Sequence, residues 1–422
     1  MSEAGDLGNR RRIRAALSCL RRHWAVALIS AGLGLAFLLL VGETLARRYL
    51  SDCWGYMQTD PKLGWSYRPG ARSNALIVWG WGRLHKQKIE INSHGLRDRE
   101  IDYPKPPGVF RFLCLGDSIL EAAQLPLEDS LTKRFEAMLN SRGGPQVYEV
   151  INAGRGNYGT DQECLFYKEE GRKYKADVVA LFVFPCNDFS DNVPELNDRA
   201  YFEKPFFSFN DGRLAWPEKL LLAGPMQELR RQNTLIRFDS RLCLGHMGGL
   251  YLRSYLKPLA QAMEYAHILP KQGKETPEGC PLALGVFHVP PGPEWLKAVD
   301  LTAAIVDALR QEVEKDGAGF RIVILPFMQP LAASYPDKVR WPAGVSEAEM
   351  DRGQPERLAR ESLSQVPAPT LDLTDVFLKA IRETGRPTNL WPDGHFNAFG
   401  HELAAKALLE FCEELGDVKA QP

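Results

Sequence analysis

Five short apolar segments alternate with stretches of helical periodicity along the C-terminal three quarters of this chain. The apolar segments cover residues 110–115, 147–152, 177–184, 320–325 and 370–373, and the helical stretches cover residues 130–141, 160–174, 295–316, 375–383 and 398–415. Strands that are apolar throughout and alternate with helices indicate a parallel sheet covered on both faces. Functional sites in such sheets lie at the carboxyl ends of the strands, so we searched there for chemistry.

Composition and charge exclude several classes of protein. The chain has 422 residues, of which 45% are hydrophobic, and 52 Lys and Arg balance 53 Asp and Glu. A net charge of −1 gives no basis for general nucleic-acid binding. Eight dispersed cysteines do not form a small disulfide scaffold and leave the disulfide pairing open. Ligand spacing predicts no metal site, and the absence of nucleotide-binding fingerprints predicts no cofactor.

The N-terminus has a composition of its own. Six arginines precede residues 24–42, which contain no charged side chain, and Arg47 and Arg48 follow them. An uncharged run of this length matches the hydrocarbon thickness of a bilayer and exceeds the apolar core of a signal peptide. The excess of arginine before the run favours a cytoplasmic N-terminus. The sequence thus predicts a single-pass membrane protein whose remainder is extracytoplasmic, in the periplasm or at the cell surface.

These patterns divide the chain into segments. We expect a basic cytoplasmic tail over residues 1–23, a transmembrane helix over 24–42, a juxtamembrane segment over 43–108 and an α/β domain over 109–418. The juxtamembrane segment is rich in glycine and tryptophan, and packing of Trp65, Tyr67, Trp79 and Trp81 against the α/β domain is favoured over membrane or sugar contacts. Residues 194–292 lack the strand–helix rhythm and are predicted to be an insertion, such as a lid or subdomain.

Four short blocks place polar residues at the ends of these elements. Gly116-Asp117-Ser118 follows the first strand, and a glycine-rich loop over residues 153–159 follows the second. Asn187-Asp188 follows the third, and Asp393-Gly394-His395 directly precedes the last helix. Each block alone fits a turn or a helix cap, but together they supply a nucleophile, oxyanion donors and an acid–base pair.

With these blocks in this order, the chain resembles the SGNH (GDSL-type) hydrolase superfamily from about residue 108 to the C-terminus. The flanking residues 118–126 and 91–98 resemble a bacterial membrane-anchored subgroup of it. The resemblance implies a three-layer α/β/α flavodoxin-like fold and chemistry through an acyl-serine. It implies that Ser118 is the nucleophile, His395 the general base and Asp393 its orienting carboxylate. Ser118 and Asn187 would also serve as oxyanion donors.

Three positions depart from the superfamily pattern. Its usual oxyanion glycine corresponds to Asn157, which can supply the same backbone N–H because asparagine tolerates left-handed backbone better than most residues. We therefore expect Asn157 to be the third oxyanion donor, with Gly156 as the alternative. Pro185 replaces a common glycine in the third block. Asp393 and His395 are separated by one residue instead of the commoner two.

The sequence therefore predicts a membrane-anchored, extracytoplasmic serine esterase of SGNH type. Its location suggests acyl esters on cell-envelope glycans, most simply O-acetyl, as the substrate. The same residues would serve an O-acyltransferase that acts on envelope polysaccharide, because the triad does not decide between water and a sugar hydroxyl as the acceptor. A non-catalytic envelope-assembly or glycan-binding protein that retains the fold is the third alternative.

Overall fold

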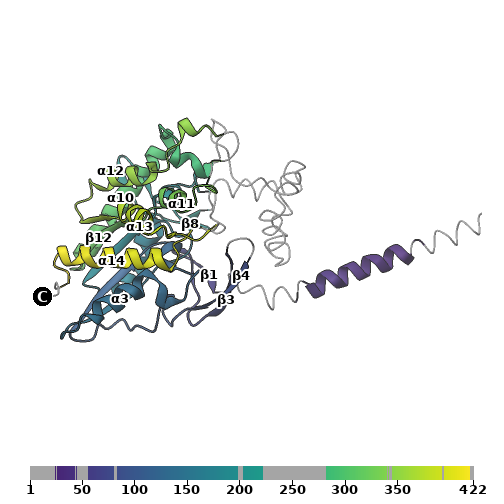
Figure 1. The fold of residues 1–422 in the computed structure, drawn as a ribbon. Coiled ribbons are helices and arrows are strands. Elements are labelled where there is room, and N and C mark those ends of the chain that lie inside the picture. Colours follow the sequence, from purple (N-terminus) through teal and green to yellow (C-terminus); the bar gives the residue numbers. More distant parts are fainter. Residues whose placement is uncertain are drawn as a thin grey trace, which may run out of the picture. The chain divides into compact units, whose positions relative to one another are not determined.

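A parallel β-sheet forms the centre of the larger compact unit of the chain (Figure 1). The structure is a computed structural model that describes residues 24, 26–42, 44, 56–79, 83–197, 203–221, 282–339, 341, 345–391 and 394–418. The sheet consists of β5 (Val109–Leu115), β6 (Val147–Asn152), β7 (Val178–Val183), β12 (Gly319–Ile324) and β13 (Thr370–Asp372), in the order β13-β12-β7-β5-β6. Every pairing within it is parallel, so the predicted parallel sheet is confirmed.

The order of these strands matches that of doubly wound sheets. Counted along the chain, the five strands lie in the order 2-1-3-4-5, which is the order of flavodoxin-like sheets. All six residues of β7 are buried, as are the last five of β5, because these central strands are covered on both faces. The first and third strands are neighbours, and connections leave them toward opposite faces of the sheet.

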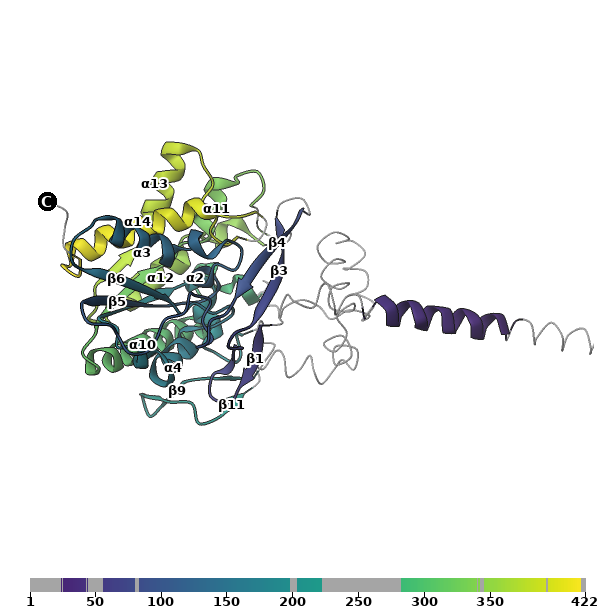
Figure 2. The same ribbon diagram turned by 90° about the horizontal axis from the view of Figure 1, so that it is seen from below.

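Helices cover both faces of the sheet (Figure 2). On one face α3 (Leu131–Ser141) packs against α14 (Ala398–Glu414), next to α13 (Thr374–Thr384) and α11 (Met328–Ser334). On the other face α10 (Pro293–Lys315) contacts α4 (Thr160–Glu169), α5 (Pro185–Asp191) and α12 (Gln354–Leu363). The short elements are α2 (Ser118–Glu121), η2 (Leu127–Asp129), η3 (Gly171–Tyr174), η4 (Leu282–Phe287) and η5 (Glu347–Glu349).

Antiparallel hairpins precede the sheet. They pair β1 (Met57–Asp60) with β2 (Gly64–Tyr67) and β3 (Arg72–Trp79) with β4 (Arg83–Glu90). Trp65 and Tyr67 are buried and belong to the same hydrophobic core as the central strands, which confirms their expected packing. Residues 52–236 and 263–422 form one compact unit, so the described part of the segment set apart over 43–108 belongs to the unit that holds the sheet.

The predicted insertion over residues 194–292 is described only in part. Two small antiparallel pairs lie within it, β8 (Lys204–Pro205) with β11 (Leu220–Leu221) and β9 (Ser208–Asn210) with β10 (Arg213–Ala215). Residues 222–281 lie outside the described residues, as does the basic tail predicted over 1–23.

The predicted membrane span falls on a helix at residues 24, 26–42 and 44, in a second unit of the chain. Among the described residues, no helix combines the length and the apolar character needed to cross a membrane. The transmembrane helix predicted over residues 24–42 is therefore not confirmed.

His401 links two helices of one face and gives a prediction about stability. Its Nδ1 accepts the N–H of Leu131 at 3.1 Å, and burial lowers its pKa from 6.5 to about 3, with Arg97, His395 and Arg134 adding to the shift. The folded protein keeps His401 neutral while the unfolded chain binds a proton, so its contribution is complete above pH 6.5 and is lost as the pH falls toward about 3.

We expect the wild type to lose about 2 kcal/mol more unfolding free energy than His401→Gln between pH 8 and pH 5, since one pKa unit corresponds to about 1.4 kcal/mol. Urea denaturation of both proteins at the two pH values measures the difference. Equal losses would show that His401 takes up no proton on unfolding.

Candidate active site

The turn after β5 places Ser118 at the carboxyl edge of the sheet. Asp117 caps α2, because its Oδ1 accepts the N–H of Ile119 at 2.9 Å, and Ser118 is the first residue of that helix. A Cβ at Gly116 would lie 3.0 Å from the side chain of Leu120 and 3.2 Å from that of Phe182. The Gly-Asp-Ser block is thus a tight turn and a helix cap, and it also presents the Ser118 hydroxyl, which is half-buried.

His395 reaches Ser118 from the other end of the chain. Its Nε2 lies 2.9 Å from Ser118 Oγ, although 277 positions separate the two residues. The loop that carries His395 is held by the bonds from the N–H of Leu390 to the His395 carbonyl, at 2.7 Å, and from Asn389 Nδ2 to the Gly394 carbonyl, at 2.8 Å. Asn397 then caps α14 by accepting the N–H groups of Phe399 and Gly400. The predicted pairing of Ser118 with His395 is therefore present in the geometry.

Asp393, the predicted partner of His395, lies outside the described residues together with Pro392. Its orienting role stays a prediction. Gly394 has a φ of +87°, and a Cβ there would lie 2.7 Å from the ring of Phe327. A glycine between Asp393 and His395 is thus required by the backbone and by the packing of Phe327.

The glycine-rich loop after β6 lies close to α2 and the turn of Ser118. A Cβ at Gly154 would lie 2.4 Å from the backbone nitrogen of Glu121 in α2, so only glycine fits there. Asn157 adopts the left-handed conformation that the sequence analysis considered, with a φ of +61°. Gly156, the alternative donor, gives its N–H to Tyr67 Oη at 2.7 Å. These facts favour Asn157 over Gly156 as the loop residue with a donor to offer.

Asn187 lies in the first turn of α5, beside the turn that carries Asp117 and Ser118. Its Nδ2 lies 3.2 Å from Asp117 Oδ2 and 3.2 Å from Asp191 Oδ2, and the side chain is buried. The structure thus brings Asn187 next to the residue that precedes Ser118. Both bonds are at the long end of the range for N–H···O contacts, so the amide hydrogens are weakly held.

A cluster of buried carboxylates lies next to Asn187. It comprises Asp117, Asp161, Glu163, Asp188 and Asp191, with Lys204 Nζ 3.0 Å from Asp161 Oδ1. Burial raises the pKa of Glu163 and of Asp188 well above the usual range, and each is raised further by the other acidic groups. One lysine does not balance five carboxylates, so proton sharing within the cluster is favoured. Within the described residues, no group of His, Cys, Asp or Glu is arranged to hold a metal ion.

Two positioning residues escaped the sequence analysis although the motif over residues 91–98 contains them. The buried Arg97 guanidinium donates to the carbonyls of Glu121 and Leu125 at 2.5 Å and of Ala122 at 3.0 Å, which satisfies the end of α2. Asp98 Oδ2 accepts the N–H of Asn152 at 2.7 Å, at the end of β6. The adjacent charged residues Arg97 and Asp98, directly after a turn, were the feature of the sequence that could have pointed to these roles.

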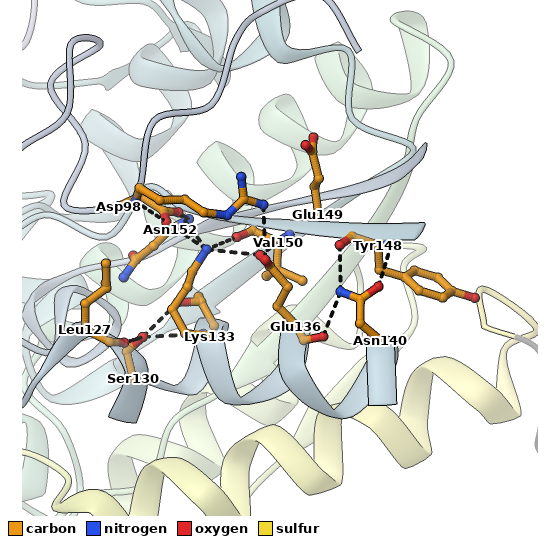
Figure 3. Close-up of polar contacts among 12 residues, drawn as sticks. Asp98, Leu127, Ser130, Lys133, Glu136, Asn140, Tyr148, Glu149, Val150 and Asn152 are labelled. Atoms are coloured by element: carbon orange, nitrogen blue, oxygen red, sulfur yellow. Dashed lines mark hydrogen bonds and ion pairs between the residues drawn. The ribbon is translucent and has the colours of Figure 1, made fainter. Parts of the chain in front are cut away.

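Figure 3 shows how Asp98 is held. Lys133 Nζ lies 2.7 Å from Asp98 Oδ1 and 3.1 Å from Glu136 Oε2, and it also donates to the carbonyl of Val150. Asn152 Oδ1 in turn accepts the N–H of Gly154 at 3.0 Å, so this network fixes the start of the glycine-rich loop. The motif over residues 91–98 therefore supports both sides of the site.

Comparison with known proteins finds solved structures that resemble this chain with low TM-scores. No protein-family model and no curated protein sequence matches the chain. Among solved structures, the acetyl xylan esterase AlAXEase is 13% identical with a TM-score of 0.36, and the match covers 71% of this chain and 98% of that one. LAE5, an alpha/beta hydrolase from the metagenome of Lake Arreo, Spain, is 12% identical with a TM-score of 0.37, covering 73% and 96%. Axe2, an acetylxylan esterase from Geobacillus stearothermophilus, is 13% identical with a TM-score of 0.35, covering 72% and 93%. At these scores the function rests on the site itself.

Arg97 and Arg99 offer a matched test of the support beneath α2. We expect Arg97→Met to lower the free energy of unfolding by about 3 kcal/mol or more, because the buried carbonyls of Glu121 and Leu125 lose their Arg97 donor and that of Ala122 keeps the N–H of Leu125. Arg99 is exposed and pairs with Glu136 at 3.1 Å, so Arg99→Met should cost less than about 1 kcal/mol. Chemical denaturation measures both variants, and a similar small loss in each would contradict the role given to Arg97.

Proposed function

We propose that this protein is a serine ester hydrolase of SGNH type. The observation that carries the proposal is the 2.9 Å contact between Ser118 Oγ and His395 Nε2 at the carboxyl edge of the sheet. A serine hydroxyl is a weak nucleophile, and a neutral imidazole within hydrogen-bond distance is the group that activates it. Catalysis of acyl transfer also needs N–H donors beside the serine. The loop that carries Asn157 and the first turn of α5, which carries Asn187, both lie next to the turn of Ser118.

In the proposed reaction, His395 Nε2 takes the Ser118 hydroxyl proton while Oγ attacks the ester carbonyl carbon. The tetrahedral intermediate collapses, the carbon–oxygen bond to the alcohol breaks, and the imidazolium returns the proton to the leaving alcohol. Water then attacks the acyl carbon while His395 takes a proton from it. The bond from that carbon to Ser118 Oγ breaks, the imidazolium returns the proton to Oγ, and the carboxylic acid leaves. Asp393 would hold the imidazole in the tautomer that keeps Nε2 free to accept the proton.

Three donors would stabilise the oxyanion. The N–H of Ser118 begins α2 and has no acceptor within that helix. The second donor would be the N–H of Asn157, which has left-handed backbone in the turn of the glycine-rich loop. Asn187 would exchange one of its two long contacts, to Asp117 or Asp191, for the oxyanion as charge develops. Loss of one such donor typically costs about 100-fold to 1000-fold in kcat.

The substrate and the location are proposed from the sequence. The uncharged run over residues 24–42 and the arginines before it favour a membrane anchor with the catalytic unit outside the cytoplasm. An esterase at that place would meet acyl groups, most simply O-acetyl, on cell-envelope glycans.

Labelling with a fluorophosphonate tests the proposed function without knowledge of the substrate. We expect the probe to modify Ser118, as located by peptide mass spectrometry, because it reacts with a serine that is activated beside an oxyanion site. Ser118→Ala and His395→Ala should abolish the label. Ser93→Ala should retain it, because Ser93 is exposed and its hydroxyl bonds to Glu100.

An unlabelled but folded wild type, or a label that survives in His395→Ala, would contradict the esterase proposal. A folded wild type without label would favour the alternative that the protein is a non-catalytic envelope-assembly or glycan-binding protein.

A further inference from the structure

Gly156 is held at both its N–H and its carbonyl by one short strand outside the central sheet. Trp65 Nε1 in β2 donates to the Gly156 carbonyl at 3.3 Å, and the N–H of Gly156 donates to Tyr67 Oη at 2.7 Å. Trp65 and Tyr67 are two positions apart in β2, so their side chains point to the same side of the strand. Both polar groups of Gly156 are thus engaged by the same face of β2.

The bond from Trp65 fixes the direction of the neighbouring N–H. A trans peptide is planar, so the Gly156 carbonyl and the Asn157 N–H point in opposite directions. While the carbonyl faces Trp65, the Asn157 N–H faces away from it. A rotation of this one peptide plane would reverse both groups and remove the proposed oxyanion donor.

The local sequence does not by itself fix the observed orientation. The N–H of Tyr158 bonds to the carbonyl of Arg155 at 3.2 Å, which closes a β-turn with Gly156 and Asn157 at its centre. φ is positive at Asn157 and not at Gly156, which is the type II arrangement. A flipped peptide would give the commoner type I turn, in which Asn157 takes the negative φ that non-glycine residues prefer. Contacts from elsewhere must hold the turn as it is.

Further contacts make β2 a rigid support for this turn. Tyr158 Oη donates to the carbonyl of Trp65 at 2.6 Å, and the two rings pack edge to face with centroids 5.5 Å apart. Tyr67 also hydrogen-bonds the buried carboxyl of Glu121, the last residue of α2, which Tyr56 Oη contacts at 3.2 Å. Burial raises the pKa of Tyr67 well above its usual range, so its hydroxyl stays protonated.

We propose that Trp65 and Tyr67 are positioning residues that hold the peptides on either side of Gly156 and so keep the Asn157 N–H directed to the oxyanion. Trp65 holds the carbonyl of the Gly156–Asn157 peptide, and Tyr67 holds the N–H of the Arg155–Gly156 peptide. This inference rests on the proposed esterase function, since it concerns a donor for that reaction. Strand β2, which precedes the α/β domain in sequence, would then help to position the proposed oxyanion donor.

Kinetics of the full chain with p-nitrophenyl acetate test this positioning role. We expect Trp65→Phe and Tyr67→Phe to lower kcat about 10-fold with KM changed less than twofold, because a misdirected donor weakens transition-state binding more than substrate binding. Tyr56→Phe is the matched control: it removes a hydroxyl from the same Glu121 without touching the turn, and kcat should change less than twofold. Active-site titration with the fluorophosphonate corrects each rate for folded enzyme.

Hydrogen–deuterium exchange supplies a readout that does not depend on activity. In Tyr67→Phe we expect the amides of residues 154–158 to exchange at least 10-fold faster, while those of β6 keep the wild-type rate. Unchanged kcat and unchanged exchange in Tyr67→Phe would overturn this positioning role, even if Trp65→Phe fails to fold. A wild type that neither turns over p-nitrophenyl acetate nor labels at Ser118 would overturn the esterase proposal, and the exchange data would still decide whether β2 holds the turn.

Discussion

The adjacency of β5 and β7 at the centre of the sheet is the constraint on which the site depends. These strands are first and third along the chain, and the connections that follow them leave toward opposite faces. Their carboxyl ends therefore meet at a topological switch point, which is where the sites of doubly wound sheets lie. Ser118 follows β5 and Asn187 follows β7, so a single topological feature brings both to one place. The loop before α14 brings His395, the proposed base, to the hydroxyl of Ser118, although 277 positions separate the two residues in sequence.

Holding polar groups at this edge has a cost that the surroundings offset. The turn after α2 gives the Ala122 carbonyl the N–H of Leu125, and the buried Arg97 adds donors for the carbonyls of Glu121, Ala122 and Leu125. At the end of β6, Lys133 donates to the carbonyl of Val150 and pairs with Asp98, which accepts the N–H of Asn152 (Figure 3). The carboxylates around Asp188 are less well balanced, and their raised pKa values show that their charged forms are disfavoured. Buried polar networks of this kind stabilise a particular geometry more than they stabilise the fold.

Much of the fold could be predicted from the sequence because its strands are buried on both faces. Such strands give unbroken apolar runs, and the predicted runs at 147–152 and 370–373 differ from β6 and β13 by at most one residue. The pairing of Ser118 with His395 followed from the resemblance to the SGNH superfamily, together with the expectation that the four blocks meet at one edge of the sheet. The roles of Trp65, Tyr67 and Arg97 did not follow, because each acts by bonding to a backbone group of a distant loop, and local sequence carries no record of such a partner. The apolar run over 24–42 matched a membrane span in composition, but no described helix meets the length and apolarity that spanning requires.

The central claim is that Ser118 carries the acyl group during the reaction. Rapid mixing with p-nitrophenyl acetate, an acid quench and peptide mass spectrometry measure this directly. The account predicts a burst of p-nitrophenol in step with the appearance of one acetyl group on the Ser118 peptide, and the loss of both in Ser118→Ala. Turnover at the wild-type rate in Ser118→Ala, or an acetyl group that accumulates on another residue, would contradict it.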